Sequence, residues 1–145
     1  MTAAPSILVM NAGSSSVKFG VFSAEETPLP ILSGAVEGIG RDRARLRVTD
    51  AAGGVVRDDA LSVSDQEEAV DDLISLLAET DVAAGMAAVG HRVVHGGPDC
   101  TCPALVTPEL EMYLNRLIPL APLHLPHNIA GIAAIRARLP ELPQV

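Results

Sequence analysis

Residues 11–18, NAGSSSVK, place an amide, a glycine, three serines and a lysine between two apolar runs. A tight turn built from glycine and small hydroxyl residues offers backbone N–H groups and O–H donors at short range, and Lys18 adds a positive charge. This donor set suits a phosphate group. The alternative is an ordinary hairpin, in which asparagine and glycine meet the geometry of the turn and the serines are solvated. A Walker A loop is excluded, because that motif leads into a helix and this turn leads into a strand pattern.

Residues 90–97, GHRVVHGG, carry a second group of polar side chains. Strand periodicity puts both histidines and Val93 on one face, and Arg92 and Val94 on the other. An arginine can hold a carboxylate or phosphate through two parallel hydrogen bonds, and a nearby valine can line a pocket for a short alkyl group. The alternatives are a surface arginine in an ion pair and histidines packed or solvated near a strand end. A two-histidine metal site lacks an evident third ligand, which makes zinc the weaker interpretation.

A third polar group, His124, His127 and Asn128, lies in the proline-rich segment 119–128, PLAPLHLPHN. Loops that position functional residues are often braced in this way. A helix-entry turn with a capping asparagine explains much of the same pattern.

The strands that must position these segments follow from the hydrophobic pattern. Residues 7–11, ILVMN, form a short apolar run that predicts a strand buried on both faces. The alternation in 17–22 predicts a second strand that pairs back on the first as a hairpin. Further strands are expected at 31–39 and 44–50, and within 87–97 before a loop, whereas 51–59 is expected to be a turn-rich connection.

Three helices are predicted. Ser64 to Glu67 fit a capping box, and apolar residues then recur at helical spacing to about residue 80. Thr107 and Pro108 suit the N-cap and first position of a second helix that ends at Pro119. The third helix is expected from about 127 to 139, and the last four residues resemble the start of another strand. This order of elements predicts one α/β unit over residues 1–145.

Composition excludes several classes of protein. The chain of 145 residues carries a net charge of -8 and has no basic run, which argues against binding to nucleic acid or to an anionic membrane. No stretch approaches the length of a membrane span, and the N-terminus lacks the features of a signal peptide, so we expect a cytoplasmic protein. The two cysteines, Cys100 and Cys102, are interpreted as reduced thiols near a loop, with a metal or redox role as a minor alternative.

Taken together, NAGSSSVKF, VGHRVVHGG and PLAPLH followed by proline and asparagine resemble the N-terminal half of the acetate kinases in order and spacing. The resemblance covers essentially the whole chain. It implies a ribonuclease H-like mixed sheet with helices, as in the superfamily of acetate and sugar kinases, heat-shock chaperones and actin. It also implies reversible transfer of the γ-phosphoryl group of ATP to acetate, with Mg²⁺ or Mn²⁺, in a homodimeric whole protein.

The resemblance assigns roles to residues that match the family's motifs. The residues implied to bind metal or nucleotide phosphates are Asn11 for the metal and Ser14, Ser16 and Lys18 for the phosphates. The residues implied to face the acetate group are Arg92 for the carboxylate, Val94 and Leu123 for the methyl group, and His124 at the cleft.

Two departures qualify the resemblance. Leu125 stands where family members commonly have asparagine, and His127 stands where they have a small residue or proline. The family's catalytic aspartate, its later stabilising residues and its adenosine site are expected beyond Val145, so the 145-residue chain is expected to lack turnover. The alternatives are a propionate kinase of the same family and a non-catalytic nucleotide-binding remnant.

Overall fold

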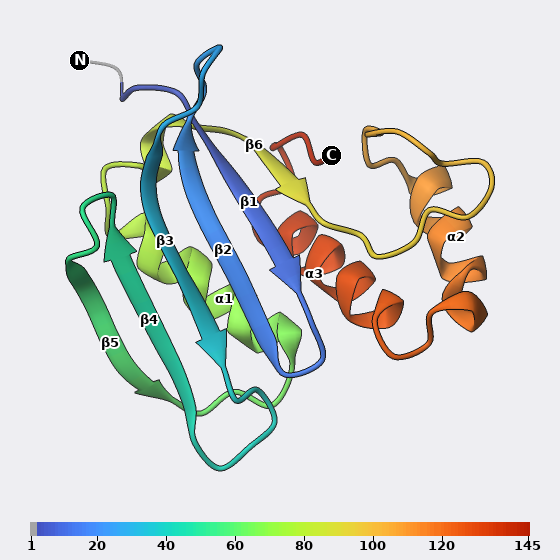
Figure 1. Ribbon diagram of the computed structural model, residues 1–145, viewed down its shortest axis with the longest axis horizontal. Coiled ribbons are helices and arrows are strands. Elements are labelled where there is room, and N and C mark those ends of the chain that lie inside the picture. Colours follow the sequence, from blue (N-terminus) through green and yellow to red (C-terminus); the bar gives the residue numbers. More distant parts are fainter. Residues whose placement is uncertain (1–2) are drawn as a thin grey trace.

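A computed structural model describes residues 3–145 and shows a single mixed sheet with helices packed against it (Figure 1). The strands are β1 (Ser6–Ala12), β2 (Ser16–Ser23), β3 (Pro30–Glu37), β4 (Ala44–Asp50), β5 (Val55–Leu61) and β6 (Met86–His91). The helices are α1 (Gln66–Ala78), α2 (Pro108–Arg116) and α3 (Leu125–Arg138), with short 3₁₀ turns η1 (Ala83–Gly85) and η2 (Ile118–Leu120). The strand order in the sheet is β5-β4-β3-β2-β1-β6.

The predicted hairpin of β1 and β2 is confirmed. The two strands pair antiparallel, with Met10 opposite Phe19 and Asn11 opposite Lys18. On its other side β1 pairs parallel with β6, with Met10 opposite His91. Parallel neighbours end at the same edge of a sheet, so the turn after β1 and the loop after β6 lie together.

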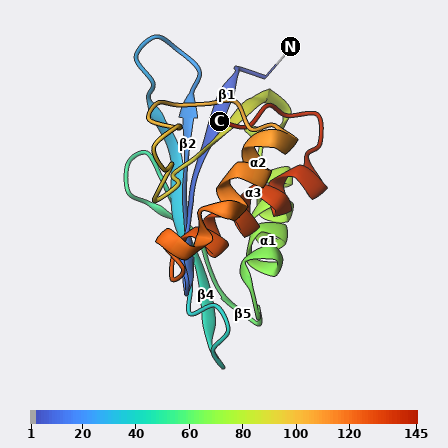
Figure 2. The same cartoon turned by 90° about the vertical axis from the view of Figure 1, so that its right-hand side faces the viewer.

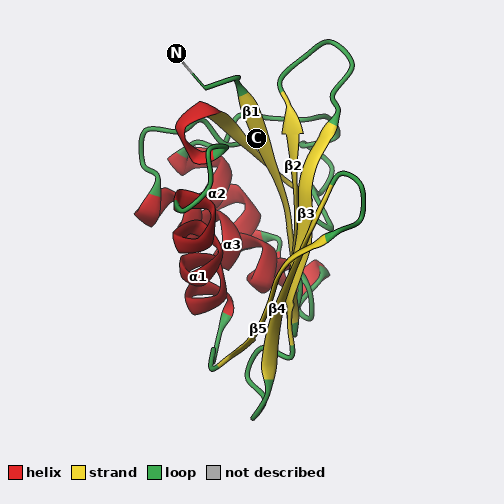
Figure 3. Ribbon diagram, turned by 90° about the vertical axis from the view of Figure 1, so that its left-hand side faces the viewer, coloured by secondary structure: helices red, strands yellow, loops and turns green. Residues whose placement is uncertain are grey.

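The helices α1 and α3 pack on one face of the sheet, as Figures 2 and 3 show from two sides. Met10, Val17 and Phe19 point to this face and are buried with Leu73 and Ile135 of the helices. The expectation that β1 is buried on both faces is wrong, because no helix of the described chain covers the other face. There Val9 is 41% exposed. We call this uncovered side of the sheet the open face.

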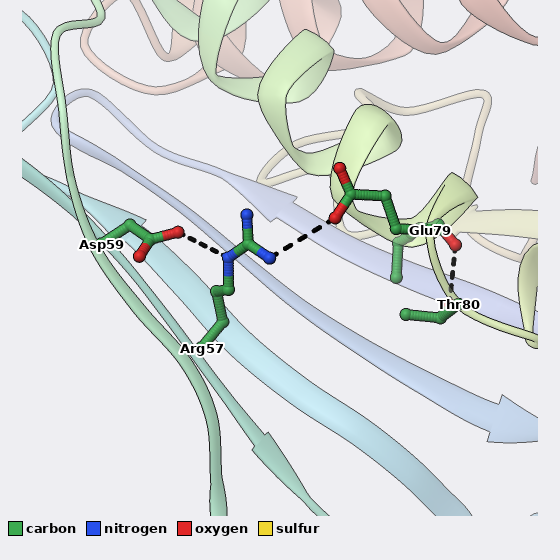
Figure 4. Close-up of polar contacts among 5 residues, drawn as sticks. Arg57, Asp59, Glu79 and Thr80 are labelled. Carbon is green, nitrogen blue, oxygen red and sulfur yellow. Dashed lines mark hydrogen bonds and ion pairs between the residues drawn. The ribbon is translucent and has the colours of Figure 1, made fainter.

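The strand β5 was not predicted, since residues 51–59 were expected to be a connection. The expectation fails because β5 is an edge strand whose charged residues hide the alternation. The Nε of Arg57 lies 2.5 Å from Oδ2 of Asp59 on the same strand, and its Nη1 lies 3.4 Å from Oε2 of Glu79, the residue that follows α1 (Figure 4). The contact with Glu79 joins the edge strand to the end of the helix.

The predicted capping box at the start of α1 is displaced by one residue. Asp65, not Ser64, is the N-cap, and its Oδ1 accepts a hydrogen bond from Glu68 N at 2.9 Å. The carboxylate of Glu68 accepts from Ser64 N and Oγ at 2.7 and 2.8 Å, which lowers the pKa of Glu68. The displacement frees Gln66, the first residue of the helix, for a contact described below.

The other helices start with the expected chemistry but with shifted ends. Thr107 caps α2, as predicted, by accepting from Leu110 N at 3.1 Å, and the helix ends at Arg116 before a 3₁₀ turn. Helix α3 starts at Leu125, two residues before the expected position. None of the helices in residues 3–145 is both long and apolar enough to cross a membrane.

The predicted strand start at the end of the chain is confirmed. Val89 N donates to Pro143 O at 3.0 Å, and Val145 N donates to Val89 O at 2.9 Å. The pairing is parallel, with Gln144 opposite Val89. Residues 143–145 therefore continue the sheet beyond β6.

Candidate functional site

Asn11 and Lys18 lie opposite each other on the open face, at the end of the β1–β2 hairpin. Their immediate neighbours Met10 and Phe19 point to the helices, so the alternation of the strands turns Asn11 and Lys18 away from the core. Lys18 is exposed and forms no ion pair with the described residues. The cation is therefore available to a ligand at this face.

The carbonyl groups of the turn are engaged by other parts of the chain. Gly13 N donates to Ser16 O at 2.8 Å, and Ile39 N donates to Ser15 O at 3.0 Å. The carbonyls of Gly13 and Ser14 accept from one side chain, as described next. By contrast, the N–H groups of Ser14 and Ser15 have no hydrogen-bond acceptor within residues 3–145. The turn thus combines satisfied acceptors with unused donors, which is the arrangement an anion requires.

The side chain of Gln66 fixes this turn from the helix side. Its Nε2 donates to Gly13 O at 2.8 Å and to Ser14 O at 3.1 Å, and the residue is 7% exposed. Sequence reasoning missed Gln66, which it counted only as part of a capping box. The only available signal was a polar residue on the apolar side of an amphipathic helix.

Arg92 follows the last residue of β6 and lies at the same end of the sheet. Arg92 N donates to Met10 O at 2.9 Å, so the register of the parallel pair continues by one residue and sets Arg92 opposite Asn11. The side chain is exposed and forms no ion pair with residues 3–145. The structure therefore brings Asn11, Lys18 and Arg92 to one end of the open face.

The predicted alternation of 91–95 stops at His91, because the strand ends there. Val93 packs in a small core with Leu114, and His95 is exposed. The two histidines have separate partners: His91 Nε2 lies 2.6 Å from Gln144 Oε1, and His95 Nδ1 accepts from Gly97 N at 2.7 Å. Burial lowers the pKa of His91, and its hydrogen bond to Gln144 opposes this effect.

Asn128 joins the end of β1 to the loop after β6. Its Nδ2 donates to Ala12 O at 2.7 Å, and its Oδ1 accepts from Val94 N at 3.0 Å. The residue is 5% exposed and lies inside α3, so it is not the capping asparagine considered above. Gly131, one turn later, lets α3 approach β1, since a Cβ atom there would lie 2.9 Å from Ala12 Cβ.

The remaining candidates lie in the loops beside this end of the sheet. Val94 is 39% exposed and Leu123 is 73% exposed. His124 is exposed and is the N-cap of α3, but its side chain makes no capping hydrogen bond. The hydrogen bond between Asn128 and Val94 places Val94 beside the first turns of α3. Among residues 3–145, no hydrogen bond joins Val94 to Leu123 or His124.

A cleft of about 540 Å³ opens beside β6, and Arg92 is in its wall. Val9 and Gly90 line it from the sheet, and Leu114 and Ile132 line it from the helices. Val94, Leu123 and His124 do not line it. The structure thus offers an arginine next to an apolar space, with valine, leucine and isoleucine side chains on the walls.

The loop after β6 is fixed to α2 by Tyr113. Its hydroxyl donates to Gly96 O at 2.9 Å and accepts from Asp99 N at 3.2 Å. Gly97 has φ 63°, a conformation that favours glycine. The two glycines at the end of GHRVVHGG therefore allow the loop to turn sharply and pack against α2.

Comparison with known proteins identifies the family. The model of the Acetokinase family matches residues 6–145. The acetate kinase of Nitrobacter hamburgensis is 46% identical over 97% of this chain, and that of Streptomyces griseus is 40% identical over 96%. In both cases the match spans 35% of the relative's own length.

Solved structures agree with the expected fold. The crystal structure of Porphyromonas gingivalis acetate kinase matches with a TM-score of 0.88 and 34% identity, covering 97% of this chain and 36% of that chain. A propionate kinase from Francisella tularensis matches with a TM-score of 0.86 and 31% identity, covering 97% of this chain and 35% of that chain. The expected mixed α/β fold is confirmed, and the chain belongs to the acetokinase family, spanning about a third of the length of the relatives it matches.

Proposed function

We propose that this chain supplies one side of the active site of an acetate kinase, which transfers the γ-phosphoryl group of ATP reversibly to acetate. The observation that carries the proposal is the convergence of Asn11, Lys18 and Arg92 on one end of the open face. Two of these side chains are cations without an ion pair among the described residues, in a chain of net charge -8. Both substrates of the proposed reaction are anions.

The β1–β2 turn is the proposed phosphate site. The N–H groups of Ser14 and Ser15 and the hydroxyls of Ser14 and Ser16 can donate to phosphate oxygens, and Lys18 adds charge next to them. Phosphoryl transfer depends mainly on positioning and on stabilising charge on the transferred group. Because the carbonyl groups of this turn are already hydrogen-bonded, its N–H donors can bind a phosphate without rearrangement of the backbone.

Arg92 is the proposed partner of the acetate carboxylate or of the acetyl phosphate group. Its guanidinium can hold two oxygens of a planar anion at once, which orients the attacking oxygen toward phosphorus. The apolar walls of the adjoining cleft suit a methyl group. Val94, Leu123 and His124 stay proposed members of this pocket on the strength of the family resemblance.

The residues present fit a magnesium ion that arrives with the nucleotide. Asn11 offers one amide oxygen, and within residues 3–145 no group of three histidine, cysteine or carboxylate side chains could hold a metal. An ion bound next to Asn11 would take its other ligands from phosphate oxygens and water, as magnesium usually does. When bound, it neutralises part of the phosphate charge.

A propionate kinase is the second candidate, because the propionate kinase from Francisella tularensis has nearly the same TM-score as the acetate kinase structure. One methylene group changes binding by only about 1–3 kcal/mol, so a single pocket residue can decide the preference. For the whole protein, the family resemblance also supports a homodimer and a cytoplasmic location.

The test is a chimaera in which residues 6–145 replace the matching segment of the Nitrobacter hamburgensis acetate kinase. With ATP, Mg²⁺, acetate and hydroxylamine, we expect the chimaera to form acetyl hydroxamate, and we expect the 145-residue chain alone to form none above background. The ratio of kcat/KM for acetate and propionate then decides between the two substrates. A chimaera that folds, judged by its circular dichroism and melting curve, but phosphorylates neither acid would overturn the proposal.

A further inference from the structure

The two cysteines of the chain lie in the wall of the cleft that also contains Arg92. Both thiols are free; Cys102 is exposed and Cys100 is partly exposed, so small oxidants can reach them. Cys100 Sγ lies 3.8 Å from Cys102 O, which shows that this thiol is directed along the chain toward the second cysteine. The chain has no other cysteine, so an intramolecular disulfide can form only between these two.

The spacing of the pair keeps the two Cα atoms close to the separation that a disulfide needs. Consecutive Cα atoms are about 3.8 Å apart, so two residues separated by one other cannot have their Cα atoms more than about 7.6 Å apart. Disulfides need a Cα separation of roughly 4.4–6.8 Å. The chain already bends at Cys102, and the intervening residue is a threonine in an irregular segment.

The two ends of this segment are fixed, but its middle is not. Cys100 N donates to Gly96 O at 3.2 Å, and a side chain at Gly96 would overlap the carbonyl oxygen of Cys100. Val106 N donates to Gln144 O at 2.7 Å. Between these points, residues 101–105 make no backbone-to-backbone hydrogen bond with any described residue. On closure of a disulfide, Cys102 is therefore the end that moves, toward Cys100, which is held against Gly96.

The geometry points to a reversible disulfide between Cys100 and Cys102 that narrows the cleft beside Arg92 when a peroxide oxidises the pair. One thiolate attacks a peroxide oxygen, forming a sulfenic acid and releasing hydroxide. The second thiolate attacks that sulfur, the S–S bond forms, and a second hydroxide leaves; with the two thiol protons these give two waters when the oxidant is hydrogen peroxide. A short, exposed ring of this kind is readily reduced, so a dithiol reverses the step.

Arg92, Gly96 and both cysteines line the same cleft. Because Cys102 moves toward Cys100 beside Gly96, we expect the cleft to narrow and reagents in solution to reach the Arg92 guanidinium less easily. The inference concerns the cleft itself and does not require the proposed kinase activity. It can therefore be tested on the 145-residue chain without any substrate.

The experiment compares the reduced chain with the chain treated with one equivalent of hydrogen peroxide. Mass spectrometry should show the loss of two hydrogen atoms, a peptide linking Cys100 and Cys102, and recovery of both thiols with dithiothreitol. The variants Cys100→Ser and Cys102→Ser should lose this mass change. An unchanged mass, direct conversion to sulfinic acid, or a disulfide between two chains would overturn the inference.

Phenylglyoxal, which reacts with guanidinium groups, reports on the cleft. In the oxidised chain we expect Arg92 to react several-fold more slowly than in the reduced chain, whereas Arg116, exposed on α2, should react equally in both. Peroxide-treated Cys102→Ser should keep the fast reaction at Arg92. Equal rates at Arg92 in the oxidised and reduced wild-type chain would show that the disulfide does not control the cleft.

Discussion

The cationic side chains differ between two regions of the sheet, the strands β4 and β5 at one edge, called the β4–β5 end, and the strands β1 and β6 with the β1–β2 turn, called the β1–β6 end. At the β4–β5 end, Arg45 Nε lies 2.5 Å from Asp58 Oδ1, and Arg57 contacts Asp59 and Glu79. Arg45 lowers the pKa of Asp58, chiefly through their hydrogen bond. At the β1–β6 end, Lys18 and Arg92 have no acidic partner among the described residues. Paired charges at an exposed edge contribute little stability, whereas unpaired cations beside a cleft are available to an anionic ligand.

The backbone at the two ends is supported differently as well. At the β1–β6 end, two buried amides, Gln66 and Asn128, hold the turn and the strand ends in place. At the β4–β5 end, the side-chain contacts that join strand to strand and strand to helix are exposed ion pairs. The end that carries the candidate site is therefore the one whose turn and strand ends are held by side chains of buried residues, which suits a site that must position charged groups.

The largest effect is expected for Arg92. In the chimaera, Arg92→Ala should lower kcat/KM for acetate by about ten- to a hundredfold, because charge-assisted hydrogen bonds of about 1.5–3 kcal/mol are lost. Arg92→Lys should restore little, since an ammonium group cannot hold two oxygens in the same plane. Steady-state hydroxamate assays measure both. Unchanged acetate kinetics in Arg92→Ala would remove this residue from the site.

Asn128→Ala should have the next largest effect, and it acts on stability. It leaves the buried Ala12 O and the partly buried Val94 N without their partner, which should cost about 1–3 kcal/mol in the free energy of unfolding. Urea unfolding checks the value. Asn115→Ala is the matched control, because that amide is exposed and bonds only to a carbonyl of its own helix. Equal losses in the two variants would show that the bridge between the strands contributes nothing.

A smaller effect, which depends on pH, is expected for His91. Burial holds its pKa in the folded chain below the usual value of about 6.5, so the unfolded chain binds the proton more readily. The stability contributed by neutral His91 is complete above that value and is lost as the pH falls below it. Between pH 7.5 and 5, the wild type should therefore lose more free energy of unfolding than His91→Gln.

His124→Gln, at an exposed position, is the control for this pH series and should follow the wild type. If His91→Gln also follows the wild type, the buried histidine does not contribute to the acid sensitivity of the fold.

The smallest effect is expected at the other end of the sheet. Arg57→Ala removes the contacts with Asp59 and Glu79, yet it should leave the melting temperature and the acetate kinetics of the chimaera nearly unchanged, because all three side chains are well exposed. Arg57→Ala removes the same guanidinium group as Arg92→Ala, so it is the matched control for that variant. If both variants lost activity to the same degree, the proposed difference between the two ends would be wrong.

Local patterns predicted much of the fold. The hairpin of β1 and β2, the strand β4, the cap at Thr107 and the strand start at the end of the chain depend on neighbouring residues, and all are present. The edge strand β5 could not be predicted, because the charged residues Arg57, Asp58 and Asp59 hide its alternation. Exposure of one face of β1 depends on where the helices pack.

The candidate site was predictable in part. The types and spacing of Asn11, Lys18 and Arg92 indicated anion chemistry, and the strand register explains why they meet. Asn128 was noted only as a site or capping candidate, and Gln66 only as part of a capping box. Their roles as buried bridges could not be recognised, because such a role is identified by its partners, and these lie more than 30 residues away in sequence.

The most direct test of the central claim is an NMR titration of the ¹⁵N-labelled 145-residue chain with inorganic pyrophosphate. We expect saturable shifts of the Ser14 and Ser15 amide signals and of the Arg92 side-chain signal, with no comparable shifts at Arg45 or Arg57. In Lys18→Ala the same signals should shift at higher pyrophosphate concentrations. Shifts that are absent from the β1–β2 turn, or that are centred on the β4–β5 end, would contradict the assignment of the phosphate site to this turn.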